Sequence, residues 1–370
     1  MLQARPTTFT LADAASATAG RLRHWLLHGP AQLKTGSEAG GIAGSVDAAG
    51  NPRYVYAEIT GYYLSWLADV AGDESGMVRE NARLALAWAI GNFGRAGQLP
   101  QTRIYLGPAE YDWRNDAIFF FDLAMLVRGI DAATEARLID DPVALRAALH
   151  GHLAQFVDGE SIRAAIQIRG ATALPARWST LGGPFLVKAS SRVAYSARHA
   201  ALPDAVALAC KSDSDRWASQ AADIDLGMLH PTLYFAEGLL LSRPGRAEAV
   251  ASLLRRCLDL ALADGSLPET DEDPTATGSS RVRNDIIAQA LRVGVLLREL
   301  HTAGAPSSAE LDCLAETLLA RIGNNDFVVF NADAQSHANV WCTMFAEQAL
   351  RWFACKPAAV SHRPSAAALV

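Results

Sequence analysis

Residues 97–130 read GQLPQTRIYLGPAEYDWRNDAIFFFDLAMLVRGI, and residues 265–300 read GSLPETDEDPTATGSSRVRNDIIAQALRVGVLLREL. Both stretches begin with Gly-x-Leu-Pro, continue through a polar and aromatic loop, and reach Arg-Asn-Asp at 114–116 or 283–285. A nearly uninterrupted apolar segment, typical of a helix that is buried on all sides, follows each Arg-Asn-Asp. Because the two motifs recur with spacings of 17 and 18 residues, we interpret the pair as an internal repeat of a helical scaffold.

Amphipathic and fully apolar helical segments alternate along the chain. Residues 76–92 and 246–263 carry apolar side chains on one helical face, whereas the segments after each Arg-Asn-Asp are apolar on nearly every side. Such pairs recur about every 50 residues, and no βαβ pattern interrupts them. An outer amphipathic helix followed by an inner apolar helix, repeated around a ring, predicts an all-α (α/α)6 toroid as a single domain over residues 1–355. The Ala- and Pro-rich tail, 356–370, is expected to be disordered.

Composition narrows the functional class. The chain has 370 residues, of which 50% are hydrophobic, and this is enough to build a sizeable core. A net charge of −6 and a pI near 5.9 argue against a nucleic-acid partner, because such proteins gather Lys and Arg on one face. No run of about 18 apolar residues predicts a membrane span, and residues 1–20 lack the apolar core of a secretion signal.

The cysteines and histidines show no metal-binding pattern. The five cysteines are odd in number and scattered, which indicates reduced thiols in a cytoplasmic protein. No Cys/His spacing suits zinc, and we expect neither a metal nor a cofactor. The sequence leaves the oligomeric state open.

Four stretches, spread over the whole chain, resemble the six-hairpin toroid proteins. They are residues 54–62 (YVYAEITGY), 230–238 (HPTLYFAEG), 283–292 (RNDIIAQALR) and 341–350 (WCTMFAEQAL). That superfamily includes N-acylglucosamine 2-epimerases, many (α/α)6 glycoside hydrolases, and helical proteins of bacterial exopolysaccharide gene clusters. The resemblance implies a toroid that acts on a sugar. It also makes His230 and His337 the nearest matches to the histidine pair with which the epimerases transfer a proton beside a sugar carbonyl.

Acid–base residues gather where the proposed inner helices begin. In a six-hairpin ring the long loops meet at one end and build a cleft, and helices that begin near Tyr54 and Asp116 would point their first turns towards it. The candidate catalytic residues at this mouth are Glu58, Asp116, His230, Asp285 and His337. The two repeat copies lie about three hairpins apart, so we expect them to face each other across the mouth.

A glycosidase needs one carboxyl group that stays protonated and one that stays ionised. The candidates are Glu58, Asp116, Glu237 and Asp285. Arg114 and Arg283 each precede an aspartate by two residues, which would favour the ionised carboxylates. Aspartates that only cap their helices would show the same pattern.

An epimerase or a lyase instead needs a base beside a carbonyl or carboxylate, and a cation for the developing charge. His230, His337 and Tyr62 could move the proton. Arginines could hold the charge, and loop aromatics could stack on sugar faces, although aromatic residues are also ordinary core material. The expected substrate-binding residues are Tyr62, Tyr111, Trp113, Arg114, Arg177, Trp178, Tyr234, Glu237, Arg283 and Trp341.

The hypothesis is therefore a carbohydrate-active enzyme of bacterial polysaccharide metabolism. It would act as a hydrolase or as an epimerase or lyase on a sugar or a uronate-containing glycan, with a small molecule or an oligosaccharide as its substrate. One alternative is a non-catalytic saccharide-binding or scaffold protein of a polysaccharide assembly system. A second is a toroid like the terpenoid cyclases, suggested by the acidic stretch 271–276 (DEDPTA). That stretch lacks the continuous acidic pattern of the class and lies in a Ser/Thr/Gly-rich loop, so a solvated loop is strongly favoured.

Overall fold

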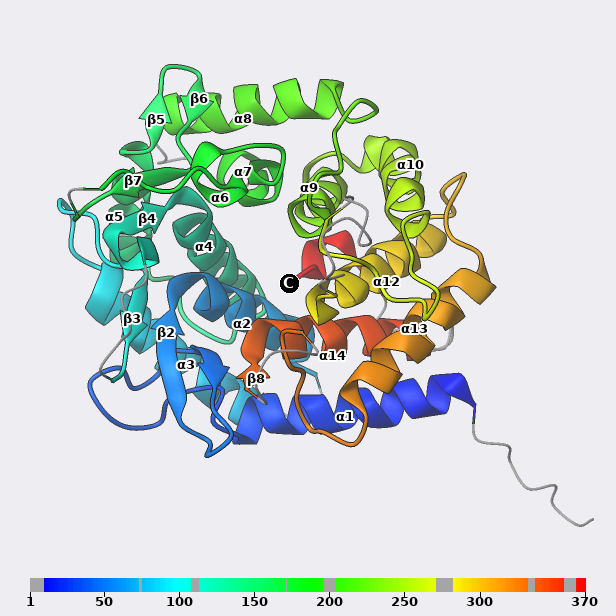
Figure 1. The fold of residues 1–370 in the computed structure, drawn as a ribbon. Helices are drawn as coiled ribbons and strands as arrows, with labels where there is room; N and C mark the ends of the chain where they lie inside the picture. The colour runs from blue at the N-terminus through cyan, green and yellow to red at the C-terminus, as the bar shows by residue number, and fades with distance from the viewer. Residues whose placement is uncertain are drawn as a thin grey trace, which may run out of the picture.

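Two concentric rings of helices form the molecule. The computed structural model describes residues 10–72, 75–107, 113–170, 172–195, 204–270, 282–331, 337–355 and 364–370. The outer ring consists of α1 (Leu11–His28), α3 (Ser75–Phe93), α5 (Val143–Ala154), α8 (Asp204–Ser219), α10 (Ala247–Leu258) and α13 (Ser308–Ile322). The inner ring consists of α2 (Ala57–Asp69), α4 (Phe120–Glu135), α7 (Leu186–Tyr195), α9 (Leu229–Ser242), α12 (Asn284–Glu299) and α14 (Val340–Ala354) (Figure 1).

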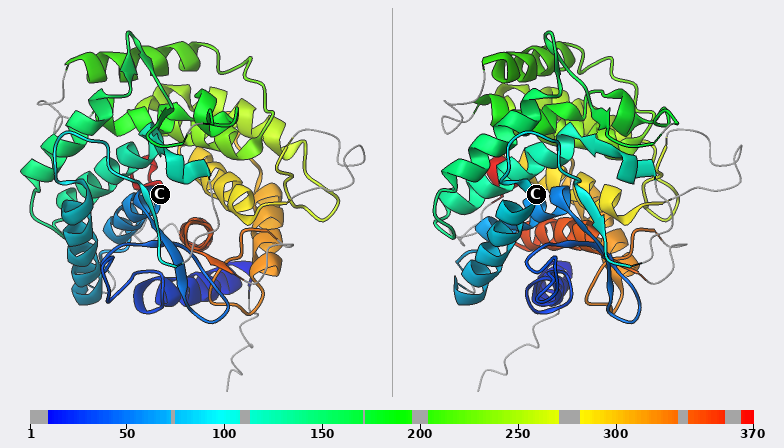
Figure 2. Two further views of the ribbon diagram at one scale, coloured as in Figure 1. Left: turned by 60° about the vertical axis from the view of Figure 1, so that its left-hand side comes forward. Right: turned by 90° about the vertical axis from the view of Figure 1, so that its left-hand side faces the viewer.

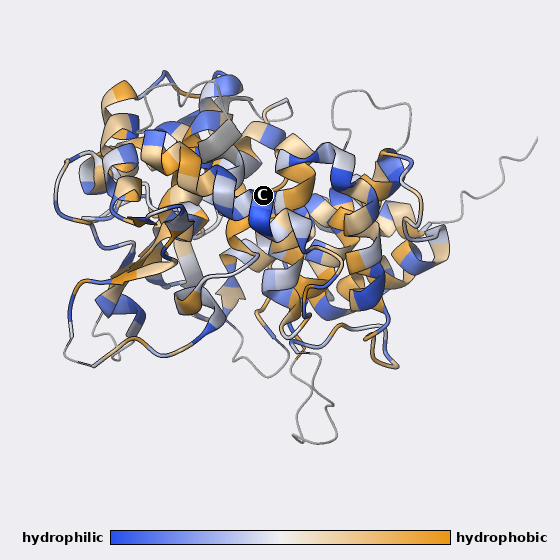
Figure 3. Cartoon of the chain, turned by 90° about the horizontal axis from the view of Figure 1, so that it is seen from above, coloured by the Kyte–Doolittle hydropathy of each residue, from blue (hydrophilic) through white to orange (hydrophobic). Residues whose placement is uncertain are grey.

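The inner helices close a ring on themselves. Each packs against the next along the chain, and α14 packs against α2, so that the last hairpin meets the first. Inner helices such as α12 and α14 are buried along nearly their whole length, as the apolar segments predicted. On the peripheral helices, hydrophilic and hydrophobic positions alternate (Figure 3). The (α/α)6 toroid expected from the sequence is confirmed.

Glycines let neighbouring inner helices approach closely. A Cβ atom on Gly61 of α2 would lie 2.2 Å from the carbonyl oxygen of Met125 on α4, and one on Gly129 would lie 2.2 Å from the oxygen of Gly61. A Cβ atom on Gly238 of α9 would lie 2.4 Å from the backbone nitrogen of Lys188 on α7. These contacts involve backbone atoms, which cannot rotate away as a side chain would.

Gly61→Ala is therefore expected to destabilise the protein by about 1–3 kcal/mol, because the added methyl group must push two helices apart. The measurement is urea unfolding followed by circular dichroism. Gly91→Ala is the matched control: Gly91 is exposed on α3, a Cβ there meets nothing within 4 Å, and a gain of about 0.4–1 kcal/mol is expected. A Gly61→Ala protein as stable as the wild type would contradict the close crossing of α2 and α4.

Short strands join the long loops at one end of the ring, which we call the loop end. A four-stranded antiparallel sheet has the order β3 (Arg103–Tyr105), β2 (Pro52–Tyr56), β1 (Ala43–Val46) and β8 (Ala338–Asn339). It connects the loops of the first, second and last hairpins (Figure 2). Two further pairs join β4 (Ala117–Phe119) to β7 (Ala165–Gln167) and β5 (Val157–Asp158) to β6 (Ser161–Ile162). Short helical turns lie at η1 (Trp113–Asp116), α6 (Trp178–Leu181), η3 (Pro244–Arg246) and η5 (Ala366–Ala368).

Two inner helices begin later than the sequence predicted. The helix expected from near Tyr54 starts at Ala57, because the Tyr-Val-Tyr run before it forms β2. The helix expected from near Asp116 starts at Phe120, because 117–119 pair with β7 as β4. Asp116 consequently ends a 3-10 turn and does not lie in the first turn of α4.

The end of the chain lies inside the ring. Leu369 and Val370 are fully buried, and Figure 1 places this segment at the centre of the toroid. The expectation of disorder over 356–370 therefore does not hold for 364–370, because the interior of the ring offers these apolar side chains a buried position. Residues 356–363 lie outside the described residues.

Two further features of the composition concern membrane-spanning helices and cysteines. Within the part of the chain that the structure describes, no helix has both the length and the hydrophobicity needed to cross a membrane. All five cysteines are free: three are buried, Cys355 is half-buried and Cys313 is exposed.

Candidate functional site

The first turns of the inner helices carry polar side chains towards the loop end. Within its first three residues, each of the six helices holds one acidic, basic or indole side chain: Glu58, Asp122, Lys188, His230, Asp285 and Trp341. Carboxylates are favoured at such positions because the helix dipole is positive at the N-terminus. The ring thus brings together side chains that lie far apart in sequence.

Asp285 accepts from three donor nitrogens, two on Arg283 just before α12 and one on Trp341 of α14. The Arg283 guanidinium donates from Nε to Oδ1 at 3.1 Å and from Nη2 to Oδ2 at 2.7 Å. The Trp341 indole donates to Oδ2 at 3.2 Å. Although burial opposes ionisation, the charge of Arg283, with a smaller effect of His230, holds the pKa of Asp285 below its usual value. Asp285 is therefore a buried, ionised carboxylate.

His230 faces two hydrogen-bond acceptors through one ring nitrogen. Its Nδ1 lies 2.7 Å from Oε1 of Gln289 and 3.4 Å from Oδ2 of Asp285. Because both partners accept, Nδ1 carries the proton, and the lone pair of a neutral ring lies on Nε2. Burial, followed by the charge of Arg283, lowers the pKa of His230 to about 4, so the ring is neutral near pH 7.

Aromatic side chains connect His230 to Glu58. The Tyr234 ring lies 4.3 Å from the His230 ring, and its hydroxyl donates to Oε1 of Glu58 at 3.4 Å. The Trp178 ring lies 6.0 Å from His230 on another side. Glu58, Trp178 and Trp341 are only half-buried, so this group of side chains is accessible to solvent.

Glu58 and Asp122 form an acidic pair that favours protonation. Burial raises the pKa of Glu58 more than the Tyr56 hydroxyl and the Lys188 charge lower it. Asp122 accepts from the Tyr56 hydroxyl at 2.9 Å and from the Thr102 hydroxyl at 2.7 Å. Burial, and then the charge of Glu58, raise the pKa of Asp122 to about 8. The two ends of the chain of contacts that runs from Asp122 to Asp285 therefore have opposite protonation states near pH 7.

The raised pKa of Asp122 predicts that stability falls as the pH rises. Between its unfolded pKa near 3.9 and its folded pKa of about 8, the folded state holds one more proton, so wild-type stability drops by up to about 1.4 kcal/mol per pH unit from this group. Asp122→Asn does not titrate and is expected to show a shallower fall between pH 5 and about 8. Urea unfolding at several pH values measures this. Parallel curves for the two proteins would contradict a protonated Asp122.

Several predicted residues lie outside this group. Trp113, Arg114 and Arg177 form a cluster in which the two guanidinium groups lie 4.6 Å and 5.9 Å from the Trp113 ring. Asp116 ends η1, four residues before α4 begins, whereas Asp285 is the second residue of α12, so the two aspartates do not occupy equivalent positions on their inner helices. The acidic residue in the first turn of α4 is instead Asp122.

His337 has different neighbours from His230, and two other predictions fall on residues that the structure does not describe. The His337 ring lies 3.5 Å from the Arg53 guanidinium of β2, whereas the contacts of His230 are with α9, α12 and α6. Tyr111 and the acidic stretch 271–276 lie outside the described residues.

Glu237 and Tyr62 lie deeper, around a lysine that the sequence interpretation missed. Lys188 donates to Oε2 of Glu237 at 2.7 Å, and Arg292 donates to Oε1 at 2.8 Å from Nε and 2.5 Å from Nη2. The Lys188 ammonium lies 4.7 Å from the Tyr62 ring and 4.4 Å from the Tyr234 ring. Although burial opposes it, the charges of Arg292 and Lys188 hold the pKa of Glu237 below its usual value.

The sequence interpretation also missed Tyr56, Asp122 and Gln289. One signal could have found Asp122 and Lys188: each is a single charge inside an apolar helical run, FFFDLAML and FLVKAS. A charge inside a buried helix needs a partner, so it marks either an ion pair or a site.

Comparison with known proteins supports the fold. No protein-family model and no curated protein matches the chain. Among solved structures, a D-mannose isomerase is similar with a TM-score of 0.67 at 12% identity, over 94% of this chain and 99% of that one. A cellobiose 2-epimerase from Spirochaeta thermophila is similar with a TM-score of 0.64 at 14% identity, over 93% and 99%. An unsaturated glucuronyl hydrolase specific for heparin is similar with a TM-score of 0.58 at 12% identity, over 93% and 96%. All share the (α/α)6 toroid.

Proposed function

We propose that the protein is a carbohydrate-active enzyme that moves a proton on a sugar, as an epimerase or isomerase does. His230 is the proposed base, and Glu58 is the proposed acid. Asp285 and Gln289 are proposed to orient the base. The observation that carries this proposal is the pair of acceptors at Nδ1 of His230, which leaves the Nε2 lone pair to accept a proton.

The proposed step uses a neutral His230 as the base and a protonated Glu58 as the acid. Nε2 of His230 takes the proton from the carbon next to the carbonyl of an open-chain sugar, and the C–H electron pair forms the double bond of an enediol. Burial raises the pKa values of both members of the Glu58–Asp122 pair, and the proton that this pair holds is given from Glu58 to the carbonyl oxygen. In an isomerisation, protonated His230 gives its proton to the neighbouring carbon, and the hydroxyl on the first carbon returns a proton to Glu58 as it becomes the new carbonyl. In an epimerisation, the enediol turns so that His230 returns the proton to the other face of the same carbon, and the original oxygen returns its proton to Glu58.

The hydrogen bonds that Asp285 already accepts favour an orienting role over nucleophilic attack on a glycosidic carbon. Its two oxygens already accept from Arg283 and Trp341, and a nucleophile would need to leave these donors. Hydrolysis remains the second candidate function, because Glu58 and Asp285 have pKa values shifted in opposite directions, as the acid and base of a glycosidase require.

Sugar as the substrate class rests on two supports. Half-buried Trp178 and Trp341 border the proposed base and its carboxylate, and indole rings stack well on the C–H faces of sugars. Solved toroids similar to this chain include a D-mannose isomerase and a cellobiose 2-epimerase.

Solvent exchange tests the proposal directly. The protein is incubated in D2O with D-mannose, D-glucose and cellobiose in separate reactions, and NMR follows the C–H signals next to the carbonyl. Incorporation of deuterium together with a new sugar is the expected result. Cleavage of a glycosidic bond without deuterium on carbon would favour hydrolysis. Binding without either change would favour a saccharide-binding protein.

A further inference from the structure

Segment 366–370 occupies the interior of the ring and is bonded to three inner helices. Gln348 of α14 donates to the carbonyl of Ala368 at 2.7 Å and accepts from the Val370 amide at 3.2 Å. Arg128 of α4 donates to the Leu369 carbonyl. Lys188 of α7 donates to the Val370 carbonyl at 2.8 Å. The segment also packs against α2 and α9, so it contacts five of the six inner helices.

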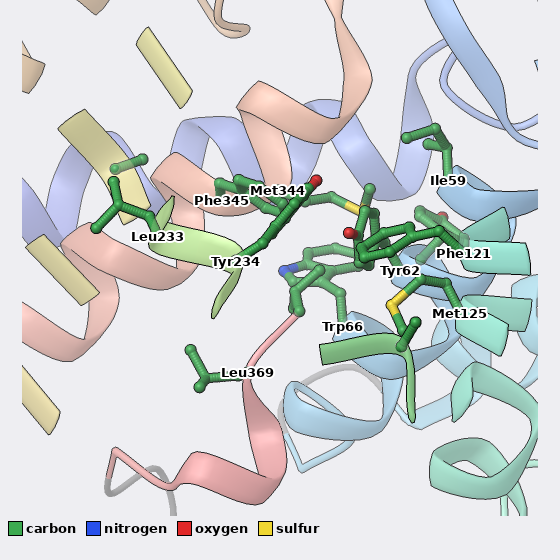
Figure 4. Close-up of a cluster of buried hydrophobic side chains, with 14 of the residues drawn as sticks. Ile59, Tyr62, Trp66, Phe121, Met125, Leu233, Tyr234, Met344, Phe345 and Leu369 are labelled. Atoms are coloured by element: carbon green, nitrogen blue, oxygen red, sulfur yellow. The ribbon is translucent and has the colours of Figure 1, made fainter. Parts of the chain in front are cut away.

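The segment lies behind the tyrosines of the site, as seen from the loop end. In Figure 4, Leu369 lies below Trp66, Tyr62, Phe121 and Tyr234. Gln348 bonds both to Ala368 and to Asp69, the last residue of α2, so Ala368 lies near the end of the ring where α2 finishes. The segment therefore does not compete for the accessible side of Glu58 and Trp178.

Lys188 is the link between this segment and the site. Its buried ammonium has one bond to Glu237 and one to the Val370 carbonyl, and it faces the rings of Tyr62 and Tyr234. A buried ammonium that loses a partner must move or take in water, because an unsatisfied charged donor is costly. Val370 is therefore one of the two bonded partners that hold the Lys188 ammonium beside the two phenol rings.

We propose that segment 366–370 is a positioning element, which holds Lys188 against Tyr62 and Tyr234 and thereby places the Tyr234 hydroxyl that bonds to Glu58. The functional half of this proposal rests on the proposed proton transfer. The structural half, the link from Val370 to Lys188, stands without it. Sequence alone offers no route to this link, because 182 residues separate Lys188 from Val370.

Nitrogen NMR of the lysine side chains tests the structural half. The chain has four lysines, so a protein labelled with ¹⁵N-lysine gives few signals, and Lys188→Met assigns one of them. Burial lowers the pKa of Lys188 to about 7. Leu369→Arg cannot dock beside Arg128 and Lys188, so water should enter and raise the Lys188 midpoint by about one pH unit or more. Ala367→Arg, on the exposed side of the same turn, should leave the midpoint unchanged.

Deuterium exchange tests the functional half. In Leu369→Arg, kcat is expected to fall about tenfold or more with KM nearly unchanged, because the segment lies behind the site and acts only on geometry. Leu369→Ala, which keeps the backbone bonds, should show a smaller loss of kcat. It provides a milder variant for the same measurement if Leu369→Arg does not fold. A Lys188 midpoint that is unchanged or lower in a folded Leu369→Arg protein would overturn the proposal, as would unchanged kcat. A wild-type protein without any exchange activity would instead defeat the proposed function and leave the NMR result standing.

Discussion

His230→Gln is expected to lower the rate of solvent-deuterium exchange by a factor of about 10²–10⁴, with little change in the binding of sugar. Glutamine fills a similar volume and can still contact Gln289 and Asp285, but its amide has no nitrogen lone pair that accepts a proton at neutral pH. The measurement compares exchange rates at saturating sugar by NMR.

The matched control is His337→Gln, which makes the same chemical change at a half-buried histidine beside Arg53. We expect this variant to keep at least about half of the wild-type rate, since general acid–base catalysis requires the base to reach the proton it abstracts. If His337→Gln lost as much activity as His230→Gln, a two-histidine mechanism would replace the one proposed.

The pH dependence of exchange follows from the same assignments. His230 must be neutral to act as a base, and its pKa is lowered to about 4, so activity should persist on acidification until the pH nears that value. Glu58 must be protonated to act as an acid, and burial raises its pKa, so activity should fall on the alkaline side. A profile that instead rises with pH through the neutral range would contradict the role of Glu58.

The sequence predicted the ring because the ring is built from local patterns. Burial on all sides gives an uninterrupted apolar helix, and burial on one side gives an amphipathic helix, so periodicity alone distinguishes the inner from the outer ring. The same reasoning found His230 and Asp285, because a histidine or an aspartate at the start of an apolar helix is visible in sequence. Both lie in one connected group of side chains in the structure.

The parts that could not be predicted depend on pairing between distant residues. The first repeat copy carries Asp116 at the motif position, but pairing of β4 with β7 moves the helix start to Phe120 and gives the site Asp122 instead. The sequence around residue 117 contains no signal that predicts its pairing with β7. Likewise, the buried Lys188 ammonium is bonded by Glu237 and Val370, which lie 49 and 182 residues away in the sequence.

Glu237→Gln is expected to destabilise the protein by about 3–5 kcal/mol near pH 7. Glu237 is the carboxylate that both Lys188 and Arg292 contact, and all three side chains are fully buried. The amide keeps the shape but leaves two cations without their counter-charge. Urea unfolding with linear extrapolation measures the loss.

Lys188→Met is the control that distinguishes the loss of the counter-charge from a general intolerance of the interior to substitution. In that variant Glu237 keeps both bonds from Arg292, so no charge is left without a partner, and a loss of only about 1–3 kcal/mol is expected. The pH dependence supplies a second test. Because the pKa of Glu237 is lowered in the folded state, its contribution is present above the unfolded pKa near 4.3 and is lost as the pH falls through the folded value. The gap between wild type and Glu237→Gln should therefore narrow on acidification. A gap that stays constant, or a Lys188→Met protein less stable than Glu237→Gln, would mean that Arg292 does not hold the carboxylate as its two bonds indicate.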